Sequence, residues 1–529
     1  MMVTKSIEIT DRHKKLLLIL SLIGAFLSIL ISSAVYEDAY ITFRVVENFI
    51  DGHGLRWNLD ERVQVYTHPL WLLLHIPFQA VLGNIFMVSL VLSWLCVAAT
   101  FWLSWRFFRA HDLLWAGFFV LPFVFSKTLA GYSASGFENP LLHLLFAAFM
   151  WVFFFVKKDR WFYLSLITAL SLLTRLDTIV FYAPLWLILL ASKGGLKVLR
   201  QVIPGLFPII LWELFSLFYY GSLLPNTAYA RIQTGIDNQE YLRLGMHYLL
   251  NLFAVDVFSA LLLLVAAAAA VIHGRHYFRN QPGAGIYFGI AVSVLCYAIY
   301  IILVGGTYLS GRLFSLPVFA SLYLLCHMVH QANIRQKRMP MGGAVMLLVG
   351  FLAFAVYPSD VKMATVCKSC FVGVDKDNWE QKIEFVDWVA GTEKLPQFGV
   401  RKIKQSVAII GSIGVLGYET DTRVKVLDPI GLSDPLMARL PTKIRKIPSM
   451  GMLSRNVPKG YPYASVTGDI SRMPEELGRY YAPLRMIVSG PLWSKERLTE
   501  IVRFNLGEYD GHLENYIQAT ARQPISRRQ

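Results

Sequence analysis

Two adjacent carboxylates, Glu37 and Asp38, follow the first apolar run of the sequence, with Tyr36 and Tyr40 on either side. Burial and a neighbouring like charge both disfavour ionisation of a carboxyl group, so we expect the pair to have perturbed pKa values. Such a carboxylate is suited to act as a general base. The same acids would also fit a cap at the end of the run or a cation site. Arg44 stands where it would pair with the acids or bind a phosphate.

Further polar motifs recur between the apolar runs of the sequence. The side chains that we single out as candidate substrate-binding groups are Arg44, Tyr66, His68, Glu138, Arg175, Asp177, Asn226, Arg231 and Arg312. Four of them are arginines, and gathered around one pocket they would suit a monophosphate or diphosphate group. Arg175 and Asp177 also fit a structural ion pair. The rings of Trp57, Tyr66 and Trp71 fit a sugar-binding surface or an aromatic belt at a membrane interface.

The composition determines which kind of protein positions these motifs. The chain has 529 residues, of which 55% are hydrophobic and only 16% are charged, whereas soluble domains carry about 25% charged residues. The deficit is confined to residues 1–357, which we predict to be a transmembrane domain, with a soluble extracytoplasmic domain at 358–529. The net charge of +15 does not indicate nucleic-acid binding, because the basic residues stand in short clusters between apolar runs, as orientation signals do.

Apolar runs near 20 residues in length predict about 11 membrane-spanning helices. They lie at about 16–35, 85–108, 113–131, 137–156, 161–191, 202–220, 257–275, 284–304, 312–331 and 341–357. The run at 161–191 contains Arg175 and Asp177 and has basic residues at both ends, so we predict a hairpin of two short helices with these charges at its tip. The basic clusters place the N-terminus in the cytoplasm and the polar motifs on the opposite side of the membrane. The apolar run at 69–83 is too short for a confident span.

We predict an α/β or α+β domain for the C-terminal part. Residues 407–410 are predicted to form a buried strand that runs into a turn at Gly411, and residues 424–428 a second strand. Helices are predicted at 475–484 and 494–502. Cys367 and Cys370 form a C-x-x-C pair, which is a weak zinc or redox motif. On the predicted outer side of the membrane, a local disulfide is the favoured state of this pair.

The order of the motifs resembles the GT-C superfamily of membrane glycosyltransferases, and within it the mycobacterial terminal arabinofuranosyltransferase family and its bacterial relatives. The resemblance covers about 30–320 and rests on E-D-A-Y-I-T-F-R, G-H-G-L-R-W-N, Y-T-H-P-L-W, S-G-F-E-N-P-L, L-L-T-R-L-D, L-P-N-T-A-Y-A-R and G-R-L-F-S-L-P. The later V-L-D-P-I-G-L-S-D, residues 426–434, resembles the start of the soluble domain of that family.

The resemblance implies an inverting transfer of a sugar from a polyprenyl-phosphate donor to an envelope glycan, lipid or protein at the outer face of the bacterial cytoplasmic membrane. It implies that Asp38 is the general base, with Glu37 beside it, and that arginines stabilise the leaving phosphate. No cofactor is certain. Glu37 and Asp38 have the oxygen ligands that a divalent cation prefers, but the sequence offers no full ligand set.

The sequence departs from the family pattern at three positions. Glu37 replaces the first of two aspartates, Thr307 replaces an acid, and Leu176 replaces a proline. The sugar is therefore not carried over as arabinose. Two rival functions remain: a transporter or flippase for a lipid-linked sugar, and a non-catalytic envelope assembly factor. Transporters often contain internal repeats, and we find no repeat in this sequence.

Overall fold

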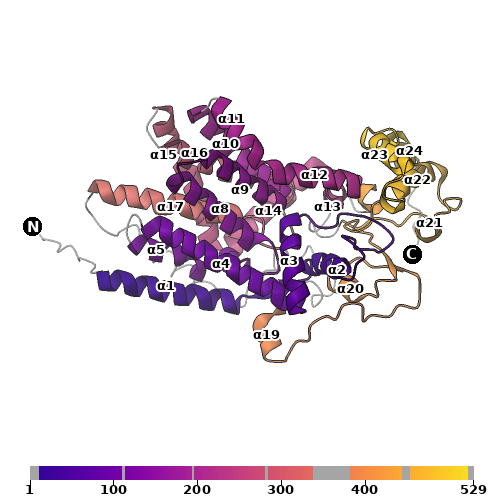
Figure 1. Ribbon diagram of the computed structural model, residues 1–529, viewed down its shortest axis with the longest axis horizontal. Coiled ribbons are helices and arrows are strands. Elements are labelled where there is room, and N and C mark those ends of the chain that lie inside the picture. Colours follow the sequence, from indigo (N-terminus) through magenta and orange to yellow (C-terminus); the bar gives the residue numbers. More distant parts are fainter. Residues whose placement is uncertain are drawn as a thin grey trace, which may run out of the picture. The chain divides into compact units, whose positions relative to one another are not determined.

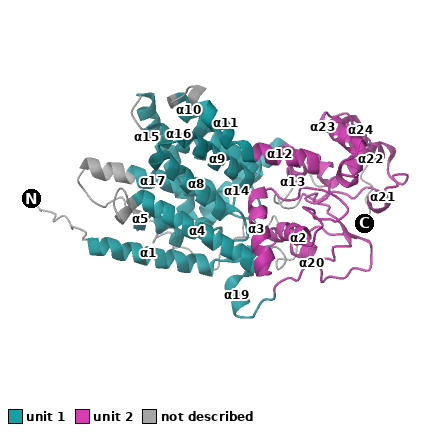
Figure 2. Ribbon diagram, viewed as in Figure 1, with its two compact units in different colours: residues 1–36, 86–208, 238–394 teal, residues 37–85, 209–237, 395–529 magenta. Residues whose placement is uncertain are grey.

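The computed structural model describes residues 11–109, 113–193, 196–279, 284–336, 382–443 and 453–521, and these residues are mostly helical (Figure 1). They form two compact units, coloured separately in Figure 2. Unit 1 comprises residues 1–36, 86–208 and 238–394, and unit 2 comprises 37–85, 209–237 and 395–529. The units are defined by contacts and not by position in a membrane, so the predicted domain boundary after residue 357 stays a prediction.

Unit 1 contains most of the long apolar helices. Its elements are α1 (Asp11–Ile31), β1 (Ala34–Tyr36), α4 (Ile85–Arg109), α5 (Leu113–Val120), α6 (Pro122–Phe125), α7 (Lys127–Gly131), α8 (Asn139–Phe155), α9 (Arg160–Thr174), η1 (Leu176–Thr178), α10 (Ile179–Lys193), α11 (Leu196–Gly205), α14 (Asn238–Val255), α15 (Val257–Phe278), α16 (Ala284–Leu303), α17 (Ser315–Gln336), β2 (Lys382–Glu384) and α19 (Phe385–Val389). The helices pack as a bundle in which α16 contacts α10, α14, α15 and α17.

Four helices of the described part of the chain are long and apolar enough to cross a membrane: α1, α4, α15 and α16. A fifth candidate is the pair Val198–Gly205 and Phe207–Tyr219, which is bent by 44°. Shorter apolar helices, among them α8 and α9, have between 10 and 17 residues. These helices support a multi-pass helical membrane protein. The predicted total of about 11 spans stays a prediction, and the run at 341–357 and the pair Cys367 and Cys370 lie outside the described residues.

The predicted break near Arg175 is confirmed. Helix α9 ends at Thr174, η1 follows at Leu176–Thr178, and α10 begins at Ile179. The single helix predicted at 113–131 is wrong, because α5, α6 and α7 replace it. Pro122 begins α6, where proline is tolerated since the first N–H groups of a helix have no intrahelical partner.

Asp256 stabilises the second interruption of this broken segment, between α6 and α7. Its Oδ2 accepts hydrogen bonds from the Thr128 N–H at 2.7 Å and from Ser126 Oγ at 3.3 Å. Ser126 in turn caps α7 through the Leu129 N–H at 2.9 Å. A buried carboxylate thus satisfies the Thr128 N–H group, which a continuous helix would bond internally.

Unit 2 combines shorter helices with a small sheet. Its elements are α2 (Ala39–Ile50), α3 (Pro69–Leu82), α12 (Phe207–Tyr219, whose first two residues belong to unit 1), α13 (Asn226–Ile232), β3 (Val407–Ile409), α20 (Val415–Glu419), β4 (Lys425–Leu427), η3 (Met437–Arg439), α21 (Tyr461–Thr467), α22 (Glu475–Ser489), α23 (Lys495–Asn505) and α24 (Asp510–Ala521). The two predicted strands are confirmed as β3 and β4, which pair in parallel, but the prediction that the first is buried is wrong, because Ile409 is 57% exposed. The two predicted C-terminal helices are confirmed as α22 and α23. The short run at 69–83 is α3, with 14 residues.

A second two-stranded sheet joins distant parts of unit 1. Strand β1 follows α1 directly and pairs antiparallel with β2, with Val35 opposite Ile383. Neither strand is predicted by the sequence. The strands have three residues each, which is too short for an alternating pattern to identify them.

Gly245 provides a test of the packing between α14 and α16. A Cβ atom built on Gly245 would lie 1.8 Å from the carbonyl oxygen of Ile302, a backbone atom that cannot turn aside. We expect Gly245→Ala to lower the free energy of unfolding by roughly 1–3 kcal/mol, the usual cost of overpacking. Thermal unfolding of the full chain in detergent measures the change.

Gly511, in the first turn of α24, is the matched control. A Cβ there meets nothing within 4 Å. Gly511→Ala should stabilise the chain by roughly 0.5–1 kcal/mol, because alanine loses less backbone entropy in a helix. Equal melting temperatures for Gly245→Ala and the wild type would contradict the close contact of the two helices.

Candidate active site

The acidic pair lies in unit 2, at the start of α2. Glu37 Oε1 accepts hydrogen bonds from Ser412 Oγ and from the Gly414 N–H, both at 2.7 Å. Asp38 occupies the N-cap position of α2, but its side chain does not cap the helix. The alternative that these acids cap the end of the first apolar run stays a prediction. The hydrogen bonds to Ser412 and Gly414 hold Glu37 in one orientation beside it.

The pKa of Glu37 is raised from its ordinary value of 4.5 to about 8. Burial is the largest cause and the charge of Asp38 the second, while the hydrogen bond from Ser412 opposes both. This result agrees with the expectation that burial and a like charge perturb the pair. At neutral pH Glu37 is mainly protonated, so the pair carries less than two negative charges.

The segment that holds Glu37 is the turn after β3. A Cβ on Gly414 would lie 2.2 Å from the carbonyl oxygen of Glu37 and 2.4 Å from its Cδ. Only glycine lets the backbone approach the acid so closely. The sequence predicts a turn at Gly411 but not the partner of this turn, because nothing in residues 412–414 indicates which acid they contact.

Arg44 is buried in unit 2 beneath the same segment. Its guanidinium donates hydrogen bonds to the carbonyl oxygens of Gly417 and Thr420, the second at 2.7 Å, and to that of Trp57 at 3.1 Å. It also lies 4.5 Å from the centre of the Trp57 ring. These contacts hold α20 and the first loop together. Arg44 therefore has a structural role in unit 2, and its predicted role in binding a phosphate stays a prediction.

The aromatic side chains of the first loop belong to the core of unit 2. Trp57, Tyr66 and Trp71 are all buried, and Tyr66 shares a hydrogen bond of 2.7 Å with the hydroxyl of Tyr220. His68 is also buried and lies 2.8 Å from Thr42 Oγ1. Neither a sugar-binding surface nor an interfacial belt describes these rings, because both require side chains that reach the surface.

A second polar cluster lies within unit 1 and joins three of the motifs. The fully buried Glu138 accepts hydrogen bonds from Arg175 Nη1 at 2.9 Å and from Arg312 Nη2 at 3.4 Å. Arg175 also binds Asp177 through two parallel hydrogen bonds of 3.0 and 2.6 Å. Arg312 lies over the Phe137 ring at 3.5 Å. We call these four charged residues the Glu138 cluster.

The loop that carries Arg312 is held from several sides. Its carbonyl oxygens accept hydrogen bonds from Tyr132 Oη at Ser310, from Tyr248 Oη at Leu309 and from Asn139 Nδ2 at Arg312. Gly311 has φ near 75°, and a Cβ there would lie 2.5 Å from Thr128 Oγ1. Gly311 thus allows the backbone conformation of this loop, and the hydrogen bonds from the two tyrosines fix the backbone that leads to Arg312.

The structure brings together two of the four arginines that the sequence analysis grouped. Arg175 and Arg312 share Glu138, whereas Arg44 and Arg231 belong to unit 2. The Glu138 cluster contains two cations and two carboxylates, so it is neutral when both acids are ionised. A single pocket with all four arginines stays a prediction.

Asn226 and the half-buried Arg231 lie on α13, next to the 426–434 motif. Asn226 Nδ2 donates to the carbonyl oxygens of Gly431, Leu432 and Asp434 at 2.8–3.1 Å. Both motifs therefore pack on each other in unit 2. The Asn226 side chain fastens the later motif to α13, a partner that neither motif reveals in sequence.

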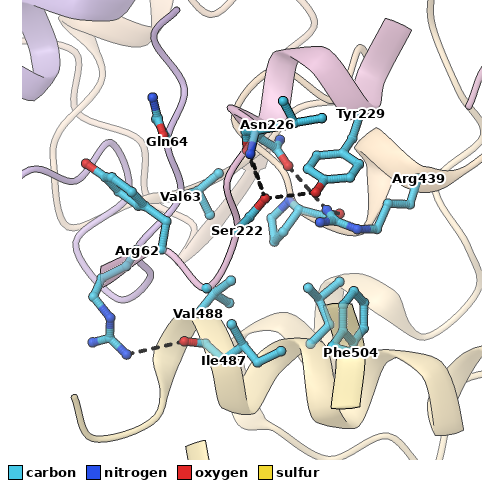
Figure 3. A pocket seen from close by; sticks show the side chains of 15 residues that line it. Arg62, Val63, Gln64, Ser222, Asn226, Tyr229, Arg439, Ile487, Val488 and Phe504 are labelled. Carbon is cyan, nitrogen blue, oxygen red and sulfur yellow. Dashed lines mark hydrogen bonds between the residues drawn. The ribbon is translucent and has the colours of Figure 1, made fainter. Parts of the chain in front are cut away.

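A small pocket lies beside Asn226 (Figure 3). Its volume is about 30 Å³, which leaves room for roughly two waters. Ser222 Oγ lies 2.8 Å from the Tyr229 hydroxyl, and Arg439 donates to the Pro435 carbonyl oxygen at 2.7 Å. These polar groups already bind protein atoms, so they are not available to a ligand. The pocket is also too small to hold a sugar ring.

The acidic pair is also a candidate cation site. Within the described part of the chain, no group of three or more His, Cys, Asp or Glu side chains could hold a metal ion. Glu37 and Asp38 supply only two carboxylates, and Glu37 already accepts two hydrogen bonds. The residues that the structure describes do not complete a cation site at the acidic pair.

Comparison with known proteins confirms the resemblance to terminal arabinofuranosyltransferases. The chain is 24% identical over 338 residues to a terminal β-(1→2)-arabinofuranosyltransferase of Corynebacterium glutamicum, and the match covers 54% of this chain and 46% of the relative. It is 24% identical over 326 residues to a protein of the same name from Mycobacterium tuberculosis, covering 54% of this chain and 51% of the relative. The chain thus spans about half the length of the curated relatives it matches. No family model and no solved structure matches.

Glu138→Gln tests the charge balance of the cluster in unit 1. The amide keeps the size of the side chain but leaves two arginines with one carboxylate. We expect a loss of roughly 3–5 kcal/mol in the free energy of unfolding, the usual cost of removing one partner of a buried ion pair. Thermal unfolding of the detergent-solubilised chain measures the change.

The control for this substitution is Glu475→Gln. Glu475 pairs with Arg479 at the surface of α22, where the two side chains are 76% and 55% exposed. The same chemical change there should cost less than about 1 kcal/mol. If both variants lost the same small amount, the Glu138 cluster would not be the buried network described above.

Glu37→Gln tests the raised pKa through stability. The folded chain binds a proton at Glu37 up to about pH 8, whereas the unfolded chain releases it near 4.5. The contribution of Glu37 to stability is therefore full below pH 4.5 and is lost as the pH rises toward about 8. The glutamine variant should lack this decline, as seen in melting temperatures across that pH window. A decline of the same slope in the variant would show that other groups cause it.

Proposed function

We propose that the chain is a membrane glycosyltransferase that takes a sugar from a polyprenyl-phosphate donor and joins it to an envelope glycan, lipid or protein. The observation that carries the proposal is the sequence relationship to two terminal arabinofuranosyltransferases. The apolar helices support a location in a membrane. The acidic pair, of which Glu37 is held by two hydrogen bonds, supports proton abstraction. We place the reaction at the outer face of the cytoplasmic membrane, following the predicted orientation.

Asp38 is the proposed general base. Its carboxylate takes the proton from an acceptor hydroxyl, and the hydroxyl oxygen then forms a bond to the anomeric carbon of the donor sugar. The bond between that carbon and the phosphate oxygen breaks, and polyprenyl phosphate leaves with the electron pair. Attack from the side opposite the phosphate inverts the anomeric configuration. The proton stays on Asp38 until it returns to solvent.

Glu37 is proposed as the group that orients Asp38. Its hydrogen bonds to Ser412 and Gly414 fix its carboxyl group, and its raised pKa keeps it mainly protonated at neutral pH. A protonated Glu37 adds no second negative charge beside the proposed base.

Arg175 and Arg312 are proposed for the charge of the leaving phosphate. Both have planar guanidinium groups of the kind that bind phosphate oxygens, and both pair with Glu138. Two of the other candidates have positioning roles in the proposal: Asn226 holds the 426–434 motif, and Asp177 orients Arg175. The sugar itself stays open, since Thr307 and Leu176 depart from the family pattern.

Asp38→Asn in the full chain tests the proposal. The purified protein, in lipid nanodiscs, is given a panel of polyprenyl-phosphate sugars and an envelope glycan acceptor, and new glycosidic bonds are detected by mass spectrometry. We expect the rate to fall by a factor on the order of 10²–10⁴, the usual contribution of a general base. The amide has nearly the same size, so folding should be retained.

Asp51→Asn is the matched control, because Asp51 is an exposed aspartate of the same loop region. Its transfer rate should equal that of the wild type. Undiminished transfer by Asp38→Asn would remove Asp38 as the base. Translocation of the lipid-linked sugar without any new glycosidic bond in the wild type would instead support the transporter alternative.

A further inference from the structure

Helix α12 exposes an apolar stripe. Ile210 is 47% exposed, Leu211 55% and Leu214 61%, and the helical spacing places Phe218 on the same side one turn later. The helix is also part of the bent pair that is apolar enough to be a membrane span. A stripe of this kind is stable against acyl chains and costly in water.

Trp493 extends this stripe beyond the end of α12. It is 78% exposed, and its ring lies 4.6 Å from the ring of Phe218. A tryptophan this exposed, next to an apolar helix, is unusual on a surface that faces only water, because the ring is among the largest apolar groups of a protein. Trp493 comes from the turn between α22 and α23, so two segments distant in sequence build one apolar surface.

The turn that carries Trp493 is fixed to α12 by Arg497. This arginine is fully buried, and it donates hydrogen bonds to the carbonyl oxygen of Leu492 at 3.1 Å and to that of Tyr219 at 2.9 Å. Asn505 adds a hydrogen bond of 2.8 Å to the carbonyl oxygen of Gly221. The position of Trp493 relative to the stripe is thus set by buried polar contacts within unit 2.

We infer that Trp493 and the stripe of Ile210, Leu211 and Leu214 form one lipid-binding surface, with the stripe against acyl chains and Trp493 at the level of the headgroups. Indole rings favour that level because one edge is apolar and the N–H group stays hydrated. The continuity with α12 selects lipid as the occupant over a protein partner. This inference does not depend on the proposed transferase activity.

A photo-crosslinking experiment tests the surface. The photoreactive residue p-benzoylphenylalanine is placed at position 493, 214 or 479 of the full chain in nanodiscs of phosphatidylethanolamine and phosphatidylglycerol. Arg479 of α22, which is 55% exposed, provides the polar control site. Lipid adducts, detected by mass spectrometry after illumination, should form at positions 214 and 493 several-fold more than at 479.

Two results would overturn the inference: adducts at position 493 no more frequent than at 479, or adducts there with protein in place of lipid. A second measurement guards against misfolding of the crosslinker variants. Brominated lipids quench tryptophan fluorescence at short range, so the variant Trp493→Phe should show less quenching than the wild type. Equal quenching of both proteins would contradict contact between Trp493 and lipid.

Discussion

A buried carboxylate must be paired, and in unit 1 this requirement determines how three motifs meet. Glu138 at the start of α8 is reached by Arg175 from the tip of the α9–α10 hairpin and by Arg312 from the loop before α17. Removing any one of these charges would leave another uncompensated in a largely buried cluster. The break between α9 and α10 lets Arg175 contact Glu138 and Asp177 together. A continuous helix would not place the guanidinium between these two partners.

Unit 2 is organised by contacts between its first loop and the segment 412–434. Arg44 donates to backbone carbonyl oxygens there, and Lys425 of β4 forms ion pairs with Asp60 and Glu61 at 2.7 and 2.9 Å. Burial raises the pKa of Glu61 to about 7, while the charge of Lys425 opposes the rise. The same packing delivers Ser412 and Gly414 to Glu37. The acidic pair is thus positioned by a region more than 370 residues later in the chain, since the Glu37–Ser412 separation is 375 residues.

The sequence predicted features that depend on local chemistry. A charged pair inside an apolar run indicated the break at Arg175, and the β-branched run at 407–410 indicated β3. Features that depend on distant partners were missed. Trp57 and Tyr66 read as surface rings because aromatic residues near a span suit an interface and a core equally well. Arg44 was predicted to pair with the acids or to bind a phosphate, because the sequence does not show that the carbonyl oxygens of residues 417 and 420 surround its guanidinium.

The two arginines of the Glu138 cluster are not equivalent for an incoming anion. Arg175 is held by two parallel hydrogen bonds to Asp177 and a third to Glu138 at 2.9 Å, whereas the contact of Arg312 with Glu138 is 3.4 Å. An arginine bound through both edges of its guanidinium loses more when it turns to a new partner. Under the proposed function, we therefore expect Arg175 to keep its contacts with Glu138 and Asp177, and the longer contact between Arg312 and Glu138 to be the one that a phosphate replaces.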